Sequence, residues 1–206
     1  MENFDFSIKK IGSNNPMFDF DKLNNISKNI ISRWPADKVY NELLAWALVY
    51  DKAYANLLQN NKSVMLKMLS IDRGGDRPRK DIYAWSMVKD LYNYVFESFD
   101  APAIDERINK QSAKEFLTDY AEKYDYSLDK QAWFEQIKQI ALAHNFADNK
   151  EYKANPSAYA GSIADACNLV RLAVTGKTAT PDLCSIMQLL GREKVQIRLQ
   201  NLIKTL

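Results

Sequence analysis

The sequence is poor in the residues that most catalytic and metal sites require. It contains two cysteines, Cys167 and Cys184, and a single histidine, His144. Two cysteines exclude a disulfide framework and a cysteine-based zinc site. One histidine excludes the paired-histidine zinc signature and most hydrolytic triads. Because only six glycines are present, there is also little material for phosphate-cradling loops. We therefore predict no catalytic residue and no metal ligand in this chain.

Long hydrophobic runs are also missing. No run approaches the roughly 18 apolar residues of a membrane span, and residues 1–10 lack the apolar core of a signal peptide. The hydrophobic fraction of 47% and the charged fraction of 26% are ordinary for a globular chain and exclude wholesale disorder. We expect a soluble, cytoplasmic protein that does not bind membranes.

The net charge of +2 conceals an uneven distribution. Residues 150–206 contain eight basic and four acidic side chains, a balance of +4, so the first 149 residues carry −2. A basic C-terminal segment on a nearly neutral body is weak evidence for a polyanionic partner.

Apolar residues recur at helical spacing through most of the chain. The pattern predicts helices over 37–58, 63–69, 85–99, 112–124, 129–145 and 162–175, one from Thr180 to Gly191, and a final helix that carries Val195, Leu199 and Leu202 on one face. Glycine- and proline-containing segments at 12–16 and 72–78 predict loops. No segment alternates as a strand would over more than a few residues, so the predicted fold class is all-α.

Local signals mark where several of these helices begin and end. Ser112 followed by Glu115 has the form of a capping box. Gly176 is suited to the left-handed position that ends a helix. Thr180 followed by Pro181 is typical of an N-cap with proline at the first helical position.

Arg171 is the most informative single residue, because it is the only charge between residues 168 and 174. A cation near a helix C-terminus can satisfy the last carbonyls of that helix. Alternatively, its guanidinium can face a nucleotide, as arginine does when single-stranded RNA is recognised. A helix beginning at Thr180–Pro181 would present free N–H groups to a phosphate or base. Both interpretations stay open from the residues alone.

Several motifs resemble one protein family. The segments RLAVTGK at 171–177, TPDL at 180–183, LLGREK at 189–194 and RL at 198–199 resemble the C-terminal anticodon-binding domain of bacterial glutamyl-tRNA synthetases. Upstream, MFDFDKL at 17–23 resembles the element that follows the KMSKS signature of that family. ELLAWA at 42–47 and PRKDIYAWS at 78–86 resemble the helical domain that comes next.

The resemblance implies a division of the chain. Residues 1–35 would be a remnant and linker after the catalytic domain, residues 36–100 a helical domain, and residues 101–206 an anticodon-binding helical cage. The Asp100–Pro102 segment supports the second boundary. The chain would then be the C-terminal fragment of a longer ligase and catalytically inert by itself. ATP and magnesium would bind the absent catalytic domain, and no cofactor is expected here.

The family also implies roles for individual residues. Arg171 matches an arginine that contacts anticodon bases, and Thr180, Pro181 and Leu183 match the turn that lies against the anticodon. Arg79 matches, in a looser alignment, a residue that reads the third anticodon base. Phosphate attraction is expected from three further cations: Lys177, Arg192 and Lys194. The implied partner is tRNA(Glu), bound by a monomer without affinity for DNA. The alternative is a free-standing helical module that binds a protein, with residues 85–99 as its candidate surface.

Overall fold

The computed structural model describes residues 19–206. The predicted loop at 12–16 and the first two residues of the 17–23 motif lie outside this range. Over the described residues the chain is helical almost throughout, and the all-α prediction is confirmed. The first group of helices comprises α1 (Phe20–Ile31), α2 (Ala36–Tyr50), α3 (Lys52–Asn60), α4 (Lys62–Ser70) and α5 (Val88–Phe96), the last preceded by a 3-10 turn at Trp85–Met87.

The second group of helices follows an extended segment. It comprises α6 (Lys110–Lys123), α7 (Lys130–Ala143), α8 (Asn149–Ala154), α9 (Ile163–Thr175), α10 (Leu183–Leu190) and α11 (Arg192–Thr205), with a 3-10 turn at Pro156–Ala158. Two very short strands, β1 (Phe146–Ala147) and β2 (Gly161–Ser162), pair in parallel. They were not expected from the sequence, since two residues are too few for strand alternation to be recognised.

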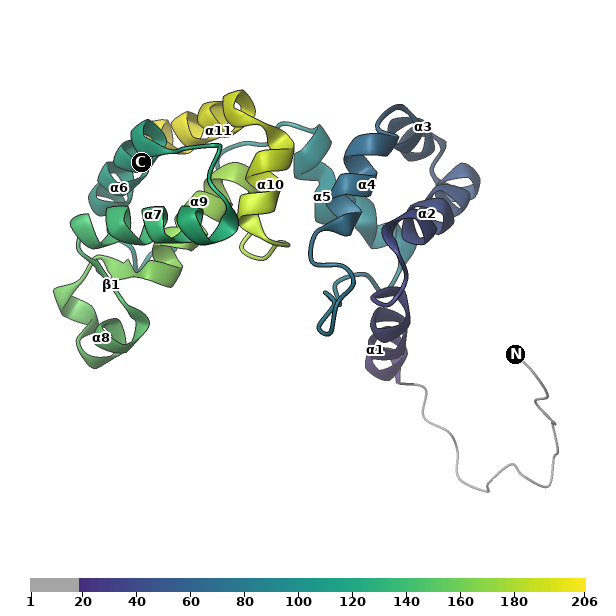
Figure 1. Ribbon diagram of the computed structural model, residues 1–206, viewed down its shortest axis with the longest axis horizontal. Coiled ribbons are helices and arrows are strands. Elements are labelled where there is room, and N and C mark those ends of the chain that lie inside the picture. The colour runs from purple at the N-terminus through teal and green to yellow at the C-terminus, as the bar shows by residue number, and fades with distance from the viewer. Residues whose placement is uncertain (1–18) are drawn as a thin grey trace, which may run out of the picture.

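The two groups occupy opposite ends of the molecule, and α10 lies where they meet (Figure 1). Helix α10 contacts α4 of the first group, while α11 packs against α6 and α9 of the second. Helix α7 also packs on α9. The buried apolar side chains form one cluster that extends from Ile31 to Ile203. The expected boundary at residues 100–102 stays a prediction.

Buried Arg198 on α11 ties the end of α5 to the end of α9. Its Nη1 donates to the Val174 carbonyl over 2.6 Å, and its Nη2 donates to the carbonyls of Tyr94 and Glu97 over 2.6 and 3.0 Å. Burial lowers the pKa of Arg198 to about 10, so the side chain stays charged at neutral pH. Helix-end carbonyls that would otherwise lack partners are satisfied in this way. The same helix buries Val195, Leu199 and Leu202, as its periodicity predicts.

Local sequence predicted several helix ends correctly. Ser162 caps α9 in a capping box with Asp165, and Asp129 caps α7 through the Ala132 N–H. Gly176 ends α9 with φ of +68°, and Gly191 separates α10 from α11 with φ of +85°. Both glycines have the positive φ that other residues rarely adopt.

One predicted helix is divided in two, and two predicted helix starts were wrong. The 37–58 segment divides into α2 and α3, because the Asp51 carboxylate accepts the Tyr54 N–H and begins a new helix there. Ser112 lies inside α6, which Asn109 caps by accepting the N–H groups of Gln111 and Ser112. Finally, Asp182, and not Thr180, caps α10. In each case a nearby Asp or Asn competes successfully for the cap position.

His144 lies at the end of a helix, and the two cysteines lie within helices. His144 ends α7, with Nε2 3.0 Å from Asp119 Oδ2 and its ring against Phe116. Cys184 is buried and Cys167 is half-buried, and both are free thiols. Among residues 19–206, no helix has the combination of length and apolar character that crossing a membrane requires.

Candidate functional site

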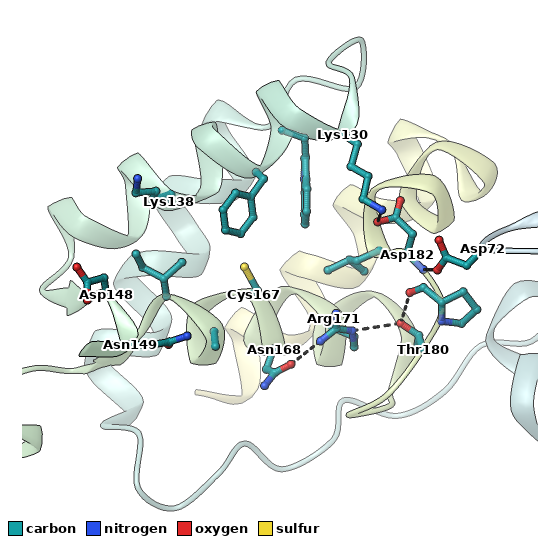
Figure 2. Close-up of a pocket in the computed structure, with 16 residues that line it drawn as sticks. Asp72, Lys130, Lys138, Asp148, Asn149, Cys167, Asn168, Arg171, Thr180 and Asp182 are labelled. Atoms are coloured by element: carbon teal, nitrogen blue, oxygen red, sulfur yellow. Dashed lines mark hydrogen bonds and ion pairs between the residues drawn. The ribbon is translucent and has the colours of Figure 1, made fainter. Parts of the chain in front are cut away.

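A cavity of about 740 Å³ is lined by residues of α7 and α9 and extends to the start of α10. Its volume is within the range of ligand pockets. Figure 2 shows Lys138, Asp148 and Asn149 at one end and Thr180, Asp182 and Asp72 at the other, with Cys167 and Arg171 between them. The remaining lining residues are mostly apolar: Lys130, Trp133, Phe134, Ile163, Ala164, Asn168, Pro181 and Leu183. The cavity therefore brings together four of the residues that the sequence singled out, Arg171, Thr180, Pro181 and Leu183.

Arg171 is half-buried in the cavity wall, one turn before the end of α9. Its Nε donates to Thr180 Oγ1 over 3.2 Å, and its Nη1 donates to Asn168 Oδ1 over 2.5 Å. Burial lowers the pKa of Arg171, but an arginine remains protonated at neutral pH. These two bonds occupy two of the five N–H donors of the guanidinium. Because both partners are neutral, the positive charge of Arg171 has no directly bonded carboxylate in the described structure.

Thr180 and Pro181 form a turn before α10 and do not begin the helix as predicted. Asp182 caps α10 by accepting the Ser185 N–H over 3.0 Å. The first N–H groups of the helix are therefore those of Leu183 and Cys184, and not those of the Thr180–Pro181 turn. What the turn offers instead is an ordered Thr180 side chain, which accepts a hydrogen bond from Arg171 and donates to the Pro181 carbonyl over 2.9 Å.

Each of the three carboxylates that line the cavity accepts a hydrogen bond from a backbone N–H group. Asp182 caps α10 and accepts Lys130 Nζ over 2.9 Å. Asp148 caps α8 through the N–H of Lys150 at 2.9 Å, and Asp72 Oδ2 accepts the Asp182 N–H at 2.9 Å. Burial raises the pKa of Asp182, but the hydrogen bonds from Lys130 and Ser185 outweigh burial and lower the pKa overall.

The aromatic wall of the cavity was missed by sequence reasoning. Trp133 on α7 is almost fully buried, and its Nε1 donates to Tyr120 Oη over 2.8 Å. The neighbouring Phe134 keeps 48% of its surface exposed and lines the cavity from α7, whereas Arg171 lines it from α9. A signal for it did exist: Trp133, Ile137 and Ile140 form the buried face of α7, so an aromatic residue at 134 lies off that face.

The other predicted site residues do not line this cavity. Arg79 lies beside it and contacts the turn, with Nη1 2.6 Å from the Thr180 carbonyl. Lys177 follows the end of α9 and is half-buried, and Arg192 is exposed at the start of α11. Lys194 donates from Nζ to the Val95 carbonyl at the end of α5 over 2.8 Å. The roles assigned to these residues stay predictions, and Lys194 has a structural partner that the sequence did not reveal.

The described part of the chain has no side-chain cluster with the geometry of a metal site. Across residues 19–206, no three His, Cys, Asp or Glu side chains gather as metal ligands do. The 72–78 loop, which carries Gly74 and Gly75, forms no phosphate cradle beside a strand, since the described strands lie at 146–147 and 161–162.

The chain belongs to the anticodon-binding domain family, whose sequence model matches residues 85–203. This range contains the whole cavity wall except Asp72. Arg79 lies before it, but it also contains seven of the eight site residues predicted from the sequence: Arg171, Thr180, Pro181, Leu183, Lys177, Arg192 and Lys194.

The chain is also similar to glutamate–tRNA ligases over nearly its whole length. It is 37% identical to that of Acetivibrio thermocellus over 206 residues, which is 98% of this chain and 38% of the relative. Identity is 33% to the Clostridium perfringens (strain 13) ligase, over 96% of this chain and 37% of the relative. Identity to the Clostridium beijerinckii ligase is 34%, over 95% of this chain and 37% of the relative. The chain thus spans well under half the length of these relatives and matches their C-terminal part. The resemblance seen in the motifs is confirmed.

Proposed function

We propose that this chain recognises the anticodon loop of tRNA(Glu) and that an unstacked anticodon base enters the cavity between α7 and α9. The observation that carries this proposal is the position of Arg171 in the cavity wall, where its charge is half-buried and bonded only to neutral side chains. Such a guanidinium retains donors for a base edge or a phosphate.

The chemistry of the cavity supports RNA as the ligand. Proteins that read single-stranded RNA combine aromatic side chains for stacking with amide and guanidinium groups for base edges. Here Phe134 supplies an exposed ring, while Asn149, Asn168 and Arg171 supply polar groups. The family match and the glutamate–tRNA ligase relatives point to the same ligand class.

The rest of the functional proposal concerns the longer protein. We propose that the chain acts as part of a cytoplasmic glutamate–tRNA ligase, which attaches glutamate to tRNA with ATP and magnesium at a site outside these residues. The chain alone would then be catalytically inert, monomeric and without affinity for DNA. The alternative of a protein-binding module based on residues 85–99 has little support, because Val88, Tyr92 and Val95 face the core and are buried.

Binding of the 206-residue chain to an anticodon stem-loop RNA tests this function. We expect the RNA with the glutamate anticodon to bind more tightly than the same stem-loop with a substituted anticodon, and binding to weaken as salt rises. A DNA hairpin of the same sequence is the control and should bind poorly. Equal affinity for both RNAs would contradict anticodon recognition, and no binding to either would contradict the function altogether.

A further inference from the structure

The Thr180–Asp182 turn is held by a loop that lies about a hundred residues earlier in the chain. Asp72 begins this loop with φ of +54°, and its Oδ2 accepts the Asp182 N–H over 2.9 Å. The Asp72 carbonyl accepts the Arg79 N–H over 2.9 Å and so closes the loop upon itself. One end of the loop therefore touches the turn directly and also fixes the backbone of Arg79.

Arg79 makes the second contact to the turn. Its Nη1 donates to the Thr180 carbonyl over 2.6 Å, and its Nε donates to Asp81 Oδ2 over 2.8 Å. The same Asp81 oxygen accepts Tyr92 Oη over 2.7 Å, and Tyr92 is buried on α5. Since the Asp81 carboxylate and the Thr180 carbonyl bind different N–H groups of the planar guanidinium, this group is held in one orientation between the first group of helices and the turn.

Thr180 is consequently held from two sides. Arg171 bonds its hydroxyl, and Arg79 bonds its carbonyl. We infer that Arg79 and Asp72 are positioning residues for the anticodon cavity: they fix the turn against which Arg171 is oriented, and Arg79 does not itself read a base. The inference rests on the proposed function and assigns Arg79 a role different from the base contact that its motif implies.

The loop offers matched variants for a test. Arg77 is exposed, and it makes no hydrogen bond or ion pair within residues 19–206, so Arg77→Ala removes the same charge without touching the turn. Arg79→Lys keeps the charge but loses the planar fork that spans two acceptors. Asp72→Asn keeps an acceptor oxygen and tolerates the positive φ, whereas Asp72→Ala does neither.

The first measurement uses the free protein and is independent of RNA. Amide hydrogen exchange at Asp182 reports whether its N–H is held by Asp72. We expect exchange to accelerate about tenfold or more in Asp72→Ala and Arg79→Ala, and to stay near wild type in Asp72→Asn and Arg77→Ala. Unchanged exchange in both Asp72→Ala and Arg79→Ala would overturn the inference, whatever the result of the RNA-binding experiment. The inference can therefore fail separately from the proposed function.

The second measurement compares affinities for the glutamate anticodon stem-loop. We expect Arg79→Ala and Arg79→Lys each to weaken binding by about tenfold, with Arg77→Ala close to wild type and all melting temperatures similar. In an Arg171→Ala background, Arg79→Ala should weaken RNA binding much less, because both residues act on one subsite. If Arg79→Lys binds as tightly as the wild type, or if Arg77→Ala loses as much affinity as Arg79→Ala, then Arg79 acts by charge attraction and the inference is overturned. A loss of affinity that adds to that of Arg171→Ala and is confined to one anticodon base would show direct base reading, and it would also overturn the inference.

Discussion

A hydrogen bond of 3.2 Å joins Arg171 Nε to Thr180 Oγ1, so the last turn of α9 and the turn before α10 form one surface. The two residues are nine positions apart in the sequence, which is why a single stretch of sequence contains both. Because Arg171 is half-buried and Thr180 also bonds the Pro181 carbonyl, the pair is ordered before any ligand enters. A preorganised polar group loses less entropy on binding than a mobile one.

Phe134 provides the first prediction. Replacing Phe134 with Ala should weaken binding of the anticodon stem-loop by about 1–3 kcal/mol, the range measured for base–aromatic stacking. Stability should change little, since nearly half of the side chain is already exposed. Leu142→Ala is the matched control, because Leu142 lies on the same helix with 43% exposure and outside the cavity. If both variants bind RNA as the wild type does, Phe134 is not a stacking surface.

The pH dependence of stability should report the Asp182 carboxylate. Its pKa is lower in the folded chain than in the unfolded one, where an aspartate titrates at about 3.9. Its charged form therefore stabilises the fold above pH 4, and this contribution disappears as pH falls through the folded pKa. Asp182→Asn retains the helix cap but loses the ion pair to Lys130, at a cost of about 0.5–1 kcal/mol at pH 7.

Thermal or urea unfolding of both proteins from pH 7 to pH 3 measures this effect. The difference in unfolding free energy between wild type and Asp182→Asn should shrink toward zero as the solution becomes acidic. A difference that stays constant across that range would show that the carboxylate charge contributes nothing.

Gly176 gives a prediction about backbone conformation. It adopts φ of +68°, and a Cβ there would lie 2.9 Å from Phe99 Cδ2. Gly75 adopts nearly the same φ, +70°, but a Cβ at that position would have no atom within 4 Å. Gly176→Ala should therefore destabilise the fold by about 1–2 kcal/mol, and Gly75→Ala by less, about 1 kcal/mol. Urea denaturation compares the two, and equal losses would mean that Phe99 moves aside without cost.

The sequence predicted features that depend on neighbouring residues. Helix ends at Ser162, Gly176 and Gly191 were identified because their signals are complete within a few residues. The apolar periodicity of 37–58 continues through Asp51, so the break between α2 and α3 left no trace in the pattern. At α10 the choice of Asp182 over Thr180 as cap depends on a carboxylate that also pairs with Lys130, about fifty residues away.

The candidate site, too, has features that nearby residues determine and features that depend on distant parts of the chain. Arg171 and the turn are close in sequence, so their association could be predicted. The position of the α7 aromatic wall in the same cavity as Arg171, and the contact from Asp72, could not be predicted, because they depend on how distant parts of the chain pack. Likewise, the motif could single out Arg79 as a candidate site residue, but its bond to a carbonyl 101 positions later could not be predicted.

The effect of Arg171 on anticodon discrimination tests the central claim most directly. The quantity is the ratio of dissociation constants for substituted and glutamate anticodon stem-loops, measured with wild type, Arg171→Ala and Arg192→Ala. Exposed Arg192 lies outside the cavity, so its variant should weaken both RNAs alike and leave the ratio unchanged. Arg171→Ala should weaken the glutamate stem-loop by about 1–3 kcal/mol and bring the ratio close to one. A ratio that survives in Arg171→Ala would contradict the account, because the cavity would then not be where the anticodon is read.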